Sequence, residues 1–496
     1  MQFREHGDRL REAALIDALV REKRSRLLAE TALYRQSVVG EVSSRDLWGA
    51  IVNRVTRSRL FRRFSKSGHP ALEGPVQRTL NVPPVPASKN SSPHQPTPPH
   101  TPMMTSESVT VRSVSPGPHP TIEVDVCIVT TCSFPGGNAS SSIEELSFFS
   151  RLGLRVVLIN CPLTRGSRKV AARYEPFVDR IVHADDVKSV RSRVVIVRHP
   201  RVIMSDTFEH LATRIESDRT VFVVNNSAYR QTGDVVFEWD QLIARVEGFG
   251  CKEKSLHPIG PALREEALRE GHAHALAQED WSPTFHATQI PFLTRFMVGP
   301  IVIGRHGRDG VEKWLESKDE LLLAYPEDAN IFVKILGGAG KARKVLGEIP
   351  GNWIVYPFGS MNVSKFLSDI DAFVYFPHSN LNEAFGRTII EAAFSGLPCI
   401  LPPRFKTTFG ELALYCEPAD VRHVLQRLTR DDPRRGEFLA AVRDEAVARF
   451  ESSALLRRLP NLLPDHQELY EQERQASLSP ELLAYRHWIE TGRPAR

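Results

Sequence analysis

Residues 383–398 read Glu383-Ala384-Phe385-Gly386-Arg387-Thr388-Ile389-Ile390-Glu391-Ala392-Ala393-Phe394-Ser395-Gly396-Leu397-Pro398. Two carboxylates, Glu383 and Glu391, lie eight residues apart, and a Gly-x-Pro sequence ends the stretch. If Gly386 opens a helix, Glu383 lies at its positively polarised start and Glu391 lies inside it. The free N–H groups of a helix start bind phosphate, and carboxylates accept hydrogen bonds from hydroxyl groups. A phosphate flanked by two polyols describes a nucleotide-sugar.

This stretch follows a predicted strand at residues 372–376 and resembles a known signature, E-x-F-G-x(4)-E-A-x(3)-G-x-P. The signature marks the donor site of retaining glycosyltransferases with the two-domain GT-B fold, in particular family GT4. The resemblance implies that Glu383 contacts hydroxyls of the donor sugar and that Glu391 contacts the ribose. It also implies that the intervening turn binds the donor; this turn is Ala384, Phe385 and Gly386. The alternative is an ordinary surface helix with one Glu at its start.

Size and composition set broad limits. A chain of 496 residues with 41% hydrophobic and 25% charged residues is typical of a globular protein with two or three domains. The sequence contains no apolar run of 18 residues, and residues 1–6 lack the apolar core of a secretory signal. The six Cys residues show no C-x-x-C spacing, which is typical of reduced thiols. We therefore expect a soluble, cytoplasmic protein.

The N-terminal part differs in composition from the rest. Residues 1–66 are predicted to form a basic helical extension, and residues 67–120 a disordered linker rich in Pro and Ser. Within the extension, residues 45–66 combine basic side chains with an apolar stripe of helical period, so that this helix could make peripheral contact with a membrane, although the stripe is broken near Ser58 and Arg59. The alternative is that this helix packs against a partner subunit or the body of the protein.

From residue 121 onward, predicted strands alternate with helices, which indicates an α/β fold with parallel sheets. The alternation restarts near residue 299, so we expect two doubly wound, Rossmann-like domains that face a cleft: an acceptor domain at 121–298 and a donor domain at 299–460. This arrangement is GT-B. A helical tail at 461–496 follows, with stretches at 468–475 and 480–490, and in GT-B chains such a tail often returns to the first domain.

The first domain contributes Gly136 and Gly137, which lie between a predicted strand and a predicted helix. Glycines let a backbone approach a phosphate closely. The pattern is not G-x-G-x-x-G, which argues against a dinucleotide cofactor. The resemblance implies that these glycines bind the donor diphosphate across the cleft, and the alternative is a plain turn. Residues 151–214 carry 13 Lys or Arg against 6 Asp or Glu, which favours an anionic acceptor or membrane face, or reflects a solvated basic surface.

The second domain opens with Arg305, which matches a Gly-Arg element of the family that grips the diphosphate. The family also has a Lys-Gly element several residues later, and it is absent here. Arg308 comes early and Lys313 late, and we favour Lys313 as the second catalytic cation, with Arg308 as a donor-binding residue. The alternative is that both are surface residues paired with Asp309 or Glu312.

His199 ends a predicted strand of the first domain, and the resemblance implies a contact with the donor sugar or the acceptor. The alternative is a structural hydrogen bond. By family analogy, residues 336–338 and 356–359 are expected to line the pocket for the base. Asp369 and Asp371 directly precede the strand that starts at Ala372, at the edge of the sheet away from the expected cleft, so we interpret them as structural.

The sequence thus predicts a retaining, hexosyltransferase-type glycosyltransferase that moves a sugar from a nucleotide-sugar to a glycan, lipid or small-molecule acceptor. We expect no metal, because the helix start and Arg305 can neutralise the leaving nucleotide. We also expect no cofactor and no nucleic-acid partner. The resemblance implies front-face attack on the donor sugar. Two alternatives remain: a GT-B nucleotide-sugar epimerase, and a non-catalytic GT-B scaffold.

Overall fold

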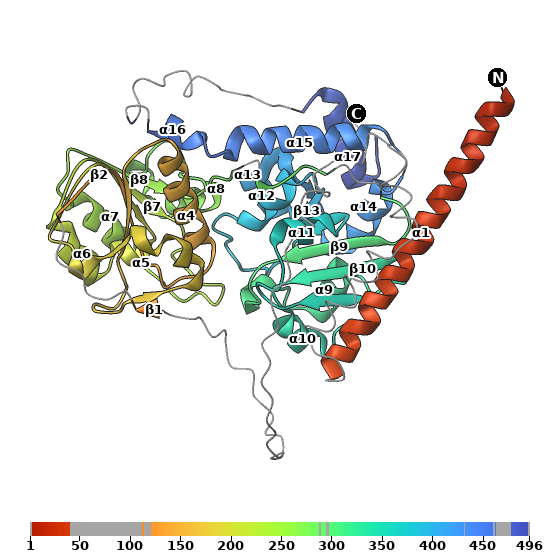
Figure 1. The fold of residues 1–496 in the computed structure, drawn as a ribbon, viewed down its shortest axis with the longest axis horizontal. Coiled ribbons are helices and arrows are strands. Elements are labelled where there is room, and N and C mark those ends of the chain that lie inside the picture. Colours follow the sequence, from red (N-terminus) through yellow and green to blue (C-terminus); the bar gives the residue numbers. More distant parts are fainter. Residues whose placement is uncertain are drawn as a thin grey trace, which may run out of the picture. The chain divides into compact units, whose positions relative to one another are not determined.

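The computed structural model describes residues 2–39, 112–113, 121–286, 289–293, 297–430, 432–459, 462 and 478–494. Two six-stranded parallel sheets form its two α/β parts, which we call the first lobe and the second lobe (Figure 1). The predicted membrane-contacting segment, residues 45–66, and most of the predicted linker lie outside the described residues. Within the predicted extension, residues Gln2–Val39 form the helix α1.

The first sheet has the strand order β5-β3-β2-β6-β7-β8, and all of its neighbouring strands are parallel. Its strands are β2 (Thr121–Thr130), β3 (Val156–Asn160), β5 (Ile181–His183), β6 (Ser189–Arg198), β7 (Ile215–Val224) and β8 (Glu253–Pro258). Its helices are α4 (Gly137–Arg151), α5 (Pro200–Ile203), α6 (Asp206–Ala212), α7 (Trp239–Glu247) and α8 (Pro261–Arg269). The strands β1 (Arg112–Ser113) and β4 (Lys169–Val170) form a separate, short antiparallel pair.

The second sheet repeats the same design, with the order β11-β10-β9-β12-β13-β14. Its strands are β9 (Ile301–His306), β10 (Ile331–Leu336), β11 (Trp353–Tyr356), β12 (Ala372–Val374), β13 (Cys399–Leu401) and β14 (Leu414–Tyr415). Its helices are α9 (Lys318–Ala324), α10 (Gly340–Leu346), α11 (Val363–Ser368), α12 (Arg387–Phe394), α13 (Lys406–Phe409), α14 (Val421–Leu428), α15 (Arg434–Phe450) and α17 (Pro480–Thr491). Short apolar runs rich in β-branched residues form the central strands because both faces of each sheet are covered.

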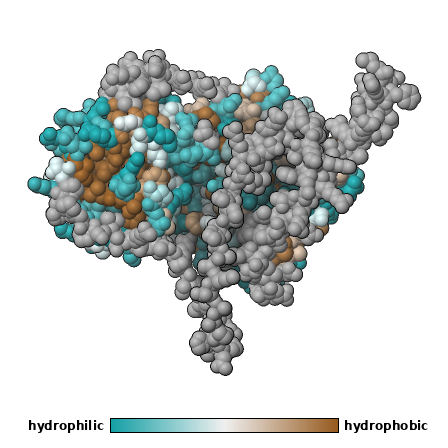
Figure 2. All heavy atoms as spheres, in the orientation of Figure 1, coloured by the Kyte–Doolittle hydropathy of each residue, from teal (hydrophilic) through white to brown (hydrophobic). Residues whose placement is uncertain are grey.

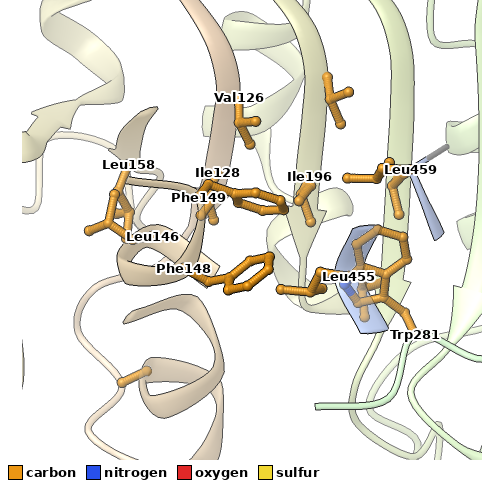
Figure 3. Close-up of a cluster of buried hydrophobic side chains, with 14 of the residues drawn as sticks. Val126, Ile128, Leu146, Phe148, Phe149, Leu158, Ile196, Trp281, Leu455 and Leu459 are labelled. Carbon is orange, nitrogen blue, oxygen red and sulfur yellow. The ribbon is translucent and has the colours of Figure 1, made fainter. Parts of the chain in front are cut away.

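The core of the first lobe includes residues from the far end of the chain. Leu146 and Phe149 of α4 pack with Ile128 and Ile196 from the sheet (Figure 3). Four leucines complete this cluster; they are Leu455, Leu456, Leu459 and Leu462, of which the first two belong to α16 (Ala454–Arg458). The chain therefore returns to the first lobe here, earlier than the predicted tail.

The described part of the tail packs on the second lobe, whereas its return to the first lobe was expected from the sequence. The predicted helix at 480–490 is present as α17, but it packs on α14, α15 and β14 of the second lobe. The carboxylate of Glu490 accepts a hydrogen bond from the N–H of Tyr415 at 3.0 Å, which fixes α17 against the sheet edge. The predicted helix at 468–475 lies outside the described residues.

The surface is mixed in character. Figure 2 shows hydrophilic residues around a hydrophobic area on the visible face of the first lobe. Within the described part of the chain, no helix combines the length and the apolar character needed to cross a bilayer. The cytoplasmic location and the membrane contact through residues 45–66 stay predictions.

Candidate active site at the carboxyl edges of the sheets

The topology of each sheet points to a site at its carboxyl edge. In the first sheet, β3 and β5 lie on one side of β2, and the strands that follow in the chain, starting with β6, lie on its other side. In the second sheet, β10 and β11 lie on one side of β9, and the later strands, starting with β12, lie on its other side. In doubly wound sheets, ligands bind outside the strand carboxyl ends at such reversals. The loops that follow these four central strands carry predicted residues, namely Gly136, His199, Arg308 and Glu383.

Glu383 is held by two side chains of the second lobe. Lys313 donates from Nζ to Oε2 of Glu383 at 2.5 Å, and the hydroxyl of Tyr375 donates to the same oxygen at 2.7 Å. The side chains of Lys313 and Glu383 are 21% and 15% exposed, so the ion pair is largely shielded from water. Lys313 pairs with Glu383, whereas the alternative interpretation placed it beside Asp309 or Glu312.

The surroundings of Glu383 favour its ionised form. Burial alone would raise its pKa, but the charge of Lys313, the hydrogen bonds from Lys313 and Tyr375, and the charge of Arg305 outweigh burial and lower the pKa below its ordinary value. The pKa of Tyr375 is raised well above its ordinary value by burial and by the charge of Glu383. At neutral pH the pair is therefore a carboxylate that accepts and a phenol that donates.

Arg305 lies beside this pair inside an aromatic frame. Its guanidinium carbon is 4.0 Å from the ring centroid of Trp314 and 4.8 Å from that of Tyr375. Nη1 donates to the carbonyl of Lys313 at 2.6 Å and to the hydroxyl of Tyr325 at 3.3 Å. Arg305 is only 3% exposed, so its positive charge acts in a region of low polarity, where electrostatic effects are strong.

Gly386 opens α12, as the sequence predicts, and the structure shows it in the left-handed conformation. Gly386 has φ 85° and ψ 51°, and a Cβ at this position would lie 2.9 Å from both Ile389 Cδ1 and Phe409 Cζ. Only glycine meets both the backbone and the space requirement. The turn thus places Glu383 before the helix start and Glu391 one turn inside α12, on either side of the first helical N–H groups.

Glu391 is paired with one cationic group and lies beside a histidine. Its Oε1 lies 3.2 Å from Nε of Arg387, and its Oε2 lies 3.4 Å from Nε2 of His306. Burial lowers the pKa of His306, the charge of Glu391 opposes this, and the net pKa is below its ordinary value. Burial also lowers the pKa of Arg387, whose guanidinium stacks 4.0 Å from the ring centroid of Phe285.

Of the two predicted glycines of the first lobe, Gly136 lies next to Arg308 of the second lobe, and a Cβ at Gly137 would have no neighbour within 4 Å. A Cβ at Gly136 would lie 3.6 Å from Nε of Arg308, and Gly136 is the N-cap of α4, which begins at Gly137. The first turn of α4 is fixed by Asn138, which donates to the hydroxyl of Thr130 at 2.8 Å. The exposed guanidinium of Arg308 and the start of a fifteen-residue helix thus point positive charge into one space.

His199 occupies a strained turn in the first lobe. Its φ of 91° is the one positive value found at a described non-glycine residue. Nδ1 accepts from the N–H of Arg201 at 3.2 Å, and the ring lies 5.3 Å from that of Phe134, centroid to centroid. Burial, with the charges of Arg201 and Arg198, lowers its pKa to about 3. His199 is therefore neutral, carries its proton on Nε2, and persists in a conformation typical of functional sites.

The two predicted walls of the base pocket meet. The N–H groups of Gly337 and Gly338 donate to the carbonyl of Tyr356 at 2.9 and 3.0 Å. The ring of Phe358 in the adjoining loop is 48% exposed. A Cβ at Gly337 would lie 1.8 Å from the carbonyl oxygen of Gly307, so glycine is required for this close approach.

The acidic residues that could suggest a metal have structural contacts. Asp309 accepts from Nε1 of Trp314 at 2.9 Å and from the N–H of Lys341 at 3.1 Å. Asp371 accepts from the N–H of Val302 at 2.8 Å, at the amino end of β9. Among the residues that the structure describes, no group of three or more His, Cys, Asp or Glu side chains is arranged to hold a metal ion.

A cavity of about 460 Å³ lies elsewhere, at the amino end of the second sheet. Its lining includes Ile16 and Val20 of α1 together with Ile301 at the start of β9. None of the predicted site residues lines it, so it is separate from the carboxyl-edge site.

Several site residues escaped the sequence analysis. They are Tyr375, Tyr325, Trp314, His306 and Arg387. Four of them had a local signal: Tyr375 directly follows β12, His306 follows Arg305, Trp314 follows Lys313, and Arg387 lies inside the signature. Tyr325 had none, because its hydroxyl reaches Val374 over 49 positions of sequence.

Comparison with solved structures identifies the fold as GT-B, which confirms the predicted α/β class. HepE from Anabaena, in complex with UDP-glucose, matches 69% of this chain and 100% of its own with a TM-score of 0.51 and 11% identity. Sucrose-phosphate synthase from Thermosynechococcus elongatus matches 69% and 98% with a TM-score of 0.48 and 13% identity. No protein-family model and no curated protein matches the sequence. At these identities the likeness concerns the fold alone.

Proposed function

We propose that this protein is a retaining glycosyltransferase that moves a sugar from a nucleotide-sugar to an acceptor hydroxyl. One observation carries the proposal. Glu383 and Glu391 both lie at the carboxyl edge of the second sheet, on either side of the start of α12, and each is paired with a cation. A nucleotide-sugar has a matching order of groups, because hydroxyls flank its diphosphate on both sides.

In this proposal, Glu383 accepts hydrogen bonds from hydroxyls of the donor sugar and Glu391 from hydroxyls of the ribose. Lys313 and Tyr375 keep Glu383 ionised and oriented, which a hydrogen-bond acceptor for a neutral sugar requires. The neutral ring of His199, with its proton on Nε2, donates to the sugar or to the acceptor.

The diphosphate would lie between the lobes at Gly136 and Gly137. The start of α4 supplies N–H groups, and Arg308 supplies the cation that the missing Lys-Gly element provides in the resembling family. We therefore assign the diphosphate contact to Arg308 and the support of Glu383 to Lys313, while buried Arg305 strengthens the positive potential nearby. Together these groups take the place of a metal ion.

The proposed reaction balances without a further reactant. The bond between the anomeric carbon and the phosphate oxygen breaks, and a bond from the same carbon to the acceptor oxygen forms on the same face. The acceptor proton passes to the departing phosphate oxygen. The residues named above position the reactants and stabilise charge, and none of them needs to form a covalent intermediate.

Nucleotide binding is the first test. We would measure thermal unfolding with UDP, GDP and ADP, starting with UDP because HepE binds UDP-glucose. A ligand at one hundred times its Kd stabilises the folded state by about 2.7 kcal/mol. Glu391→Gln should abolish this shift, and Glu437→Gln on the exposed part of α15 is the matched control. Equal shifts in both variants would remove Glu391 from the site.

Product analysis separates the candidate functions. Incubation with UDP-sugars and simple acceptors should release UDP and form a glycoside whose anomeric configuration, read by NMR, equals that of the donor. Formation of an epimeric nucleotide-sugar would support the isomerase alternative, and binding without turnover would support the scaffold. Activity that chelator removes and divalent cations restore would contradict the metal-independent mechanism.

A further inference from the structure

A buried carboxylate of the first lobe joins three of its elements. Glu266 of α8 is 3% exposed. Its Oε2 accepts from the hydroxyl of Ser227 at 2.6 Å, and its Oε1 accepts from the N–H of Ala228 at 2.8 Å and from Nε1 of Trp239 at 3.4 Å. A buried carboxylate with several donors is held in one position, since any movement leaves a donor or an acceptor unsatisfied.

The fourth donor to this carboxylate comes from the second lobe. Asn382 donates from Nδ2 to Oε2 of Glu266 at 2.6 Å, across 116 positions of sequence. Asn382 directly precedes Glu383. The same segment touches α8 a second time, because a Cβ at Gly260, the N-cap of α8, would lie 3.2 Å from Cδ2 of Phe385 and 3.6 Å from the carbonyl oxygen of Ala384.

The loop between β12 and α12 needs such contacts because it has no regular secondary structure. Its first half is anchored inside the second lobe, where the N–H of His378 donates to the carbonyl of Glu312 at 3.2 Å and the N–H of Ser379 donates to the carboxylate of Glu316 at 3.1 Å. Its second half, residues 382–385, is anchored on α8 of the first lobe. The backbone of Glu383 is therefore positioned from the opposite lobe.

We propose that Asn382 and Glu266 are positioning residues that set the place of Glu383 for the reaction. The proposal rests on the proposed function of Glu383 and adds a residue pair that the signature does not contain. Lys313 and Tyr375 orient the carboxylate of Glu383, and the Asn382–Glu266 bond fixes the chain that carries it. The pair couples the contact between the lobes to the geometry of the donor sugar.

An exchange of the two polar groups tests this pair. Asn382→Asp sets two carboxylates against each other, and we expect kcat to fall about tenfold to hundredfold, as for a lost hydrogen bond to a charged group. Adding Glu266→Gln restores one donor and one acceptor, so the double variant should regain most of the activity. The UDP-dependent thermal shift should stay, since nucleotide binding is assigned to Glu391. Asn380→Asp, the same change on an exposed part of the loop, is the matched control.

Three results would overturn the inference. The first is an equal kcat in Asn382→Asp and Asn380→Asp. The second is a double variant whose kcat does not rise above that of Asn382→Asp. The third is a coupling between positions 382 and 266 that is seen in the unfolding free energy and not in kcat. If Asn382→Asp does not fold, Asn382→Ala removes the donor without adding charge and should still lower kcat relative to the unaltered protein. Absence of transfer by the unaltered protein with every UDP-, GDP- and ADP-sugar would instead contradict the proposed function.

Discussion

Replacing Lys313 by Met tests whether its ammonium keeps Glu383 ionised. The two groups are 2.5 Å apart, and both side chains are mostly buried, at 21% and 15% exposure. A hydrogen bond between charged groups in such a place contributes about 2 kcal/mol, which corresponds to about thirtyfold in rate. We therefore expect Lys313→Met to lower kcat/KM for the UDP-sugar by about thirtyfold near neutral pH.

The pH dependence gives the sharper measurement. Burial raises the pKa of Glu383, and the charge of Lys313 is the largest influence that lowers it. In the unaltered protein the net pKa is below the ordinary value of 4.5, so Glu383 stays ionised above that pH and loses its charge only at lower pH. Without Lys313, burial prevails and the pKa rises, so the acid limb of the kcat/KM profile should move to higher pH.

Two control variants accompany this measurement. Lys313→Arg keeps the positive charge and should keep the acid limb near its original position. Lys344→Met removes an exposed charge from α10 and should leave the whole profile unchanged. If the acid limb of Lys313→Met coincides with that of the unaltered protein, the ion pair does not set the ionisation of Glu383 and the reasoning is wrong.

Three further predictions concern single positions. Gly386→Ala should lower the unfolding free energy by at least about 1–3 kcal/mol in denaturant titrations, because the φ of Gly386 is 85° and neighbouring side chains fill the space that a Cβ would need. The control Gly436→Ala, inside α15, should leave the unfolding free energy unchanged or raise it. The pKa of His199 is about 3 in the folded protein and about 6.5 in the unfolded chain, so between these pH values only the unfolded state binds a proton at this ring. The unfolding free energy should therefore fall as the pH drops from about 6.5 toward 3, and His199→Gln should reduce this dependence on pH. Tyr375→Phe removes a 2.7 Å hydrogen bond to Glu383 and should lower kcat about threefold to thirtyfold in steady-state assays, with no loss of UDP binding.

The parts of the site that the sequence predicted well are local. Gly386 opens α12, and α12 ends before Gly396, which has φ 75°, as the Gly-x-Pro ending indicates. These features depend on backbone preferences of a few neighbouring residues. The two sheets were predictable for a similar reason, because apolar strands alternating with helices have few possible arrangements.

The parts that the sequence left open depend on contacts between distant residues. Arg308 and Lys313 have the same charge and lie five positions apart, and only the fold shows that Lys313 reaches Glu383, 70 positions away, while Arg308 faces Gly136. The return to the first lobe was expected after residue 460, and the described residues 451–459 and Leu462 already make it. Its leucines pack in the core of the first lobe, and a helical apolar pattern alone does not say which core it joins.

Both signature carboxylates have a neighbour in the chain that reaches beyond the second lobe. Asn382 precedes Glu383 and binds Glu266, and Arg387, which is paired with Glu391, donates from Nη1 to the carbonyl of Thr284 at 3.3 Å. Thr284 follows the first sheet in the chain and is 2% exposed. Separation of the lobes would break the bond between Asn382 and Glu266, because Glu266 belongs to α8 of the first lobe. Thr284 adjoins Phe285, whose N–H donates to the carbonyl of Phe450 in α15 at 2.8 Å, so the contact of Arg387 with Thr284 lies where the chain enters the second lobe. If Glu383 contacts the donor sugar as proposed, separation of the lobes would remove the support that α8 gives to the loop carrying Glu383, whereas Glu391 would keep its pairing with Arg387 inside α12.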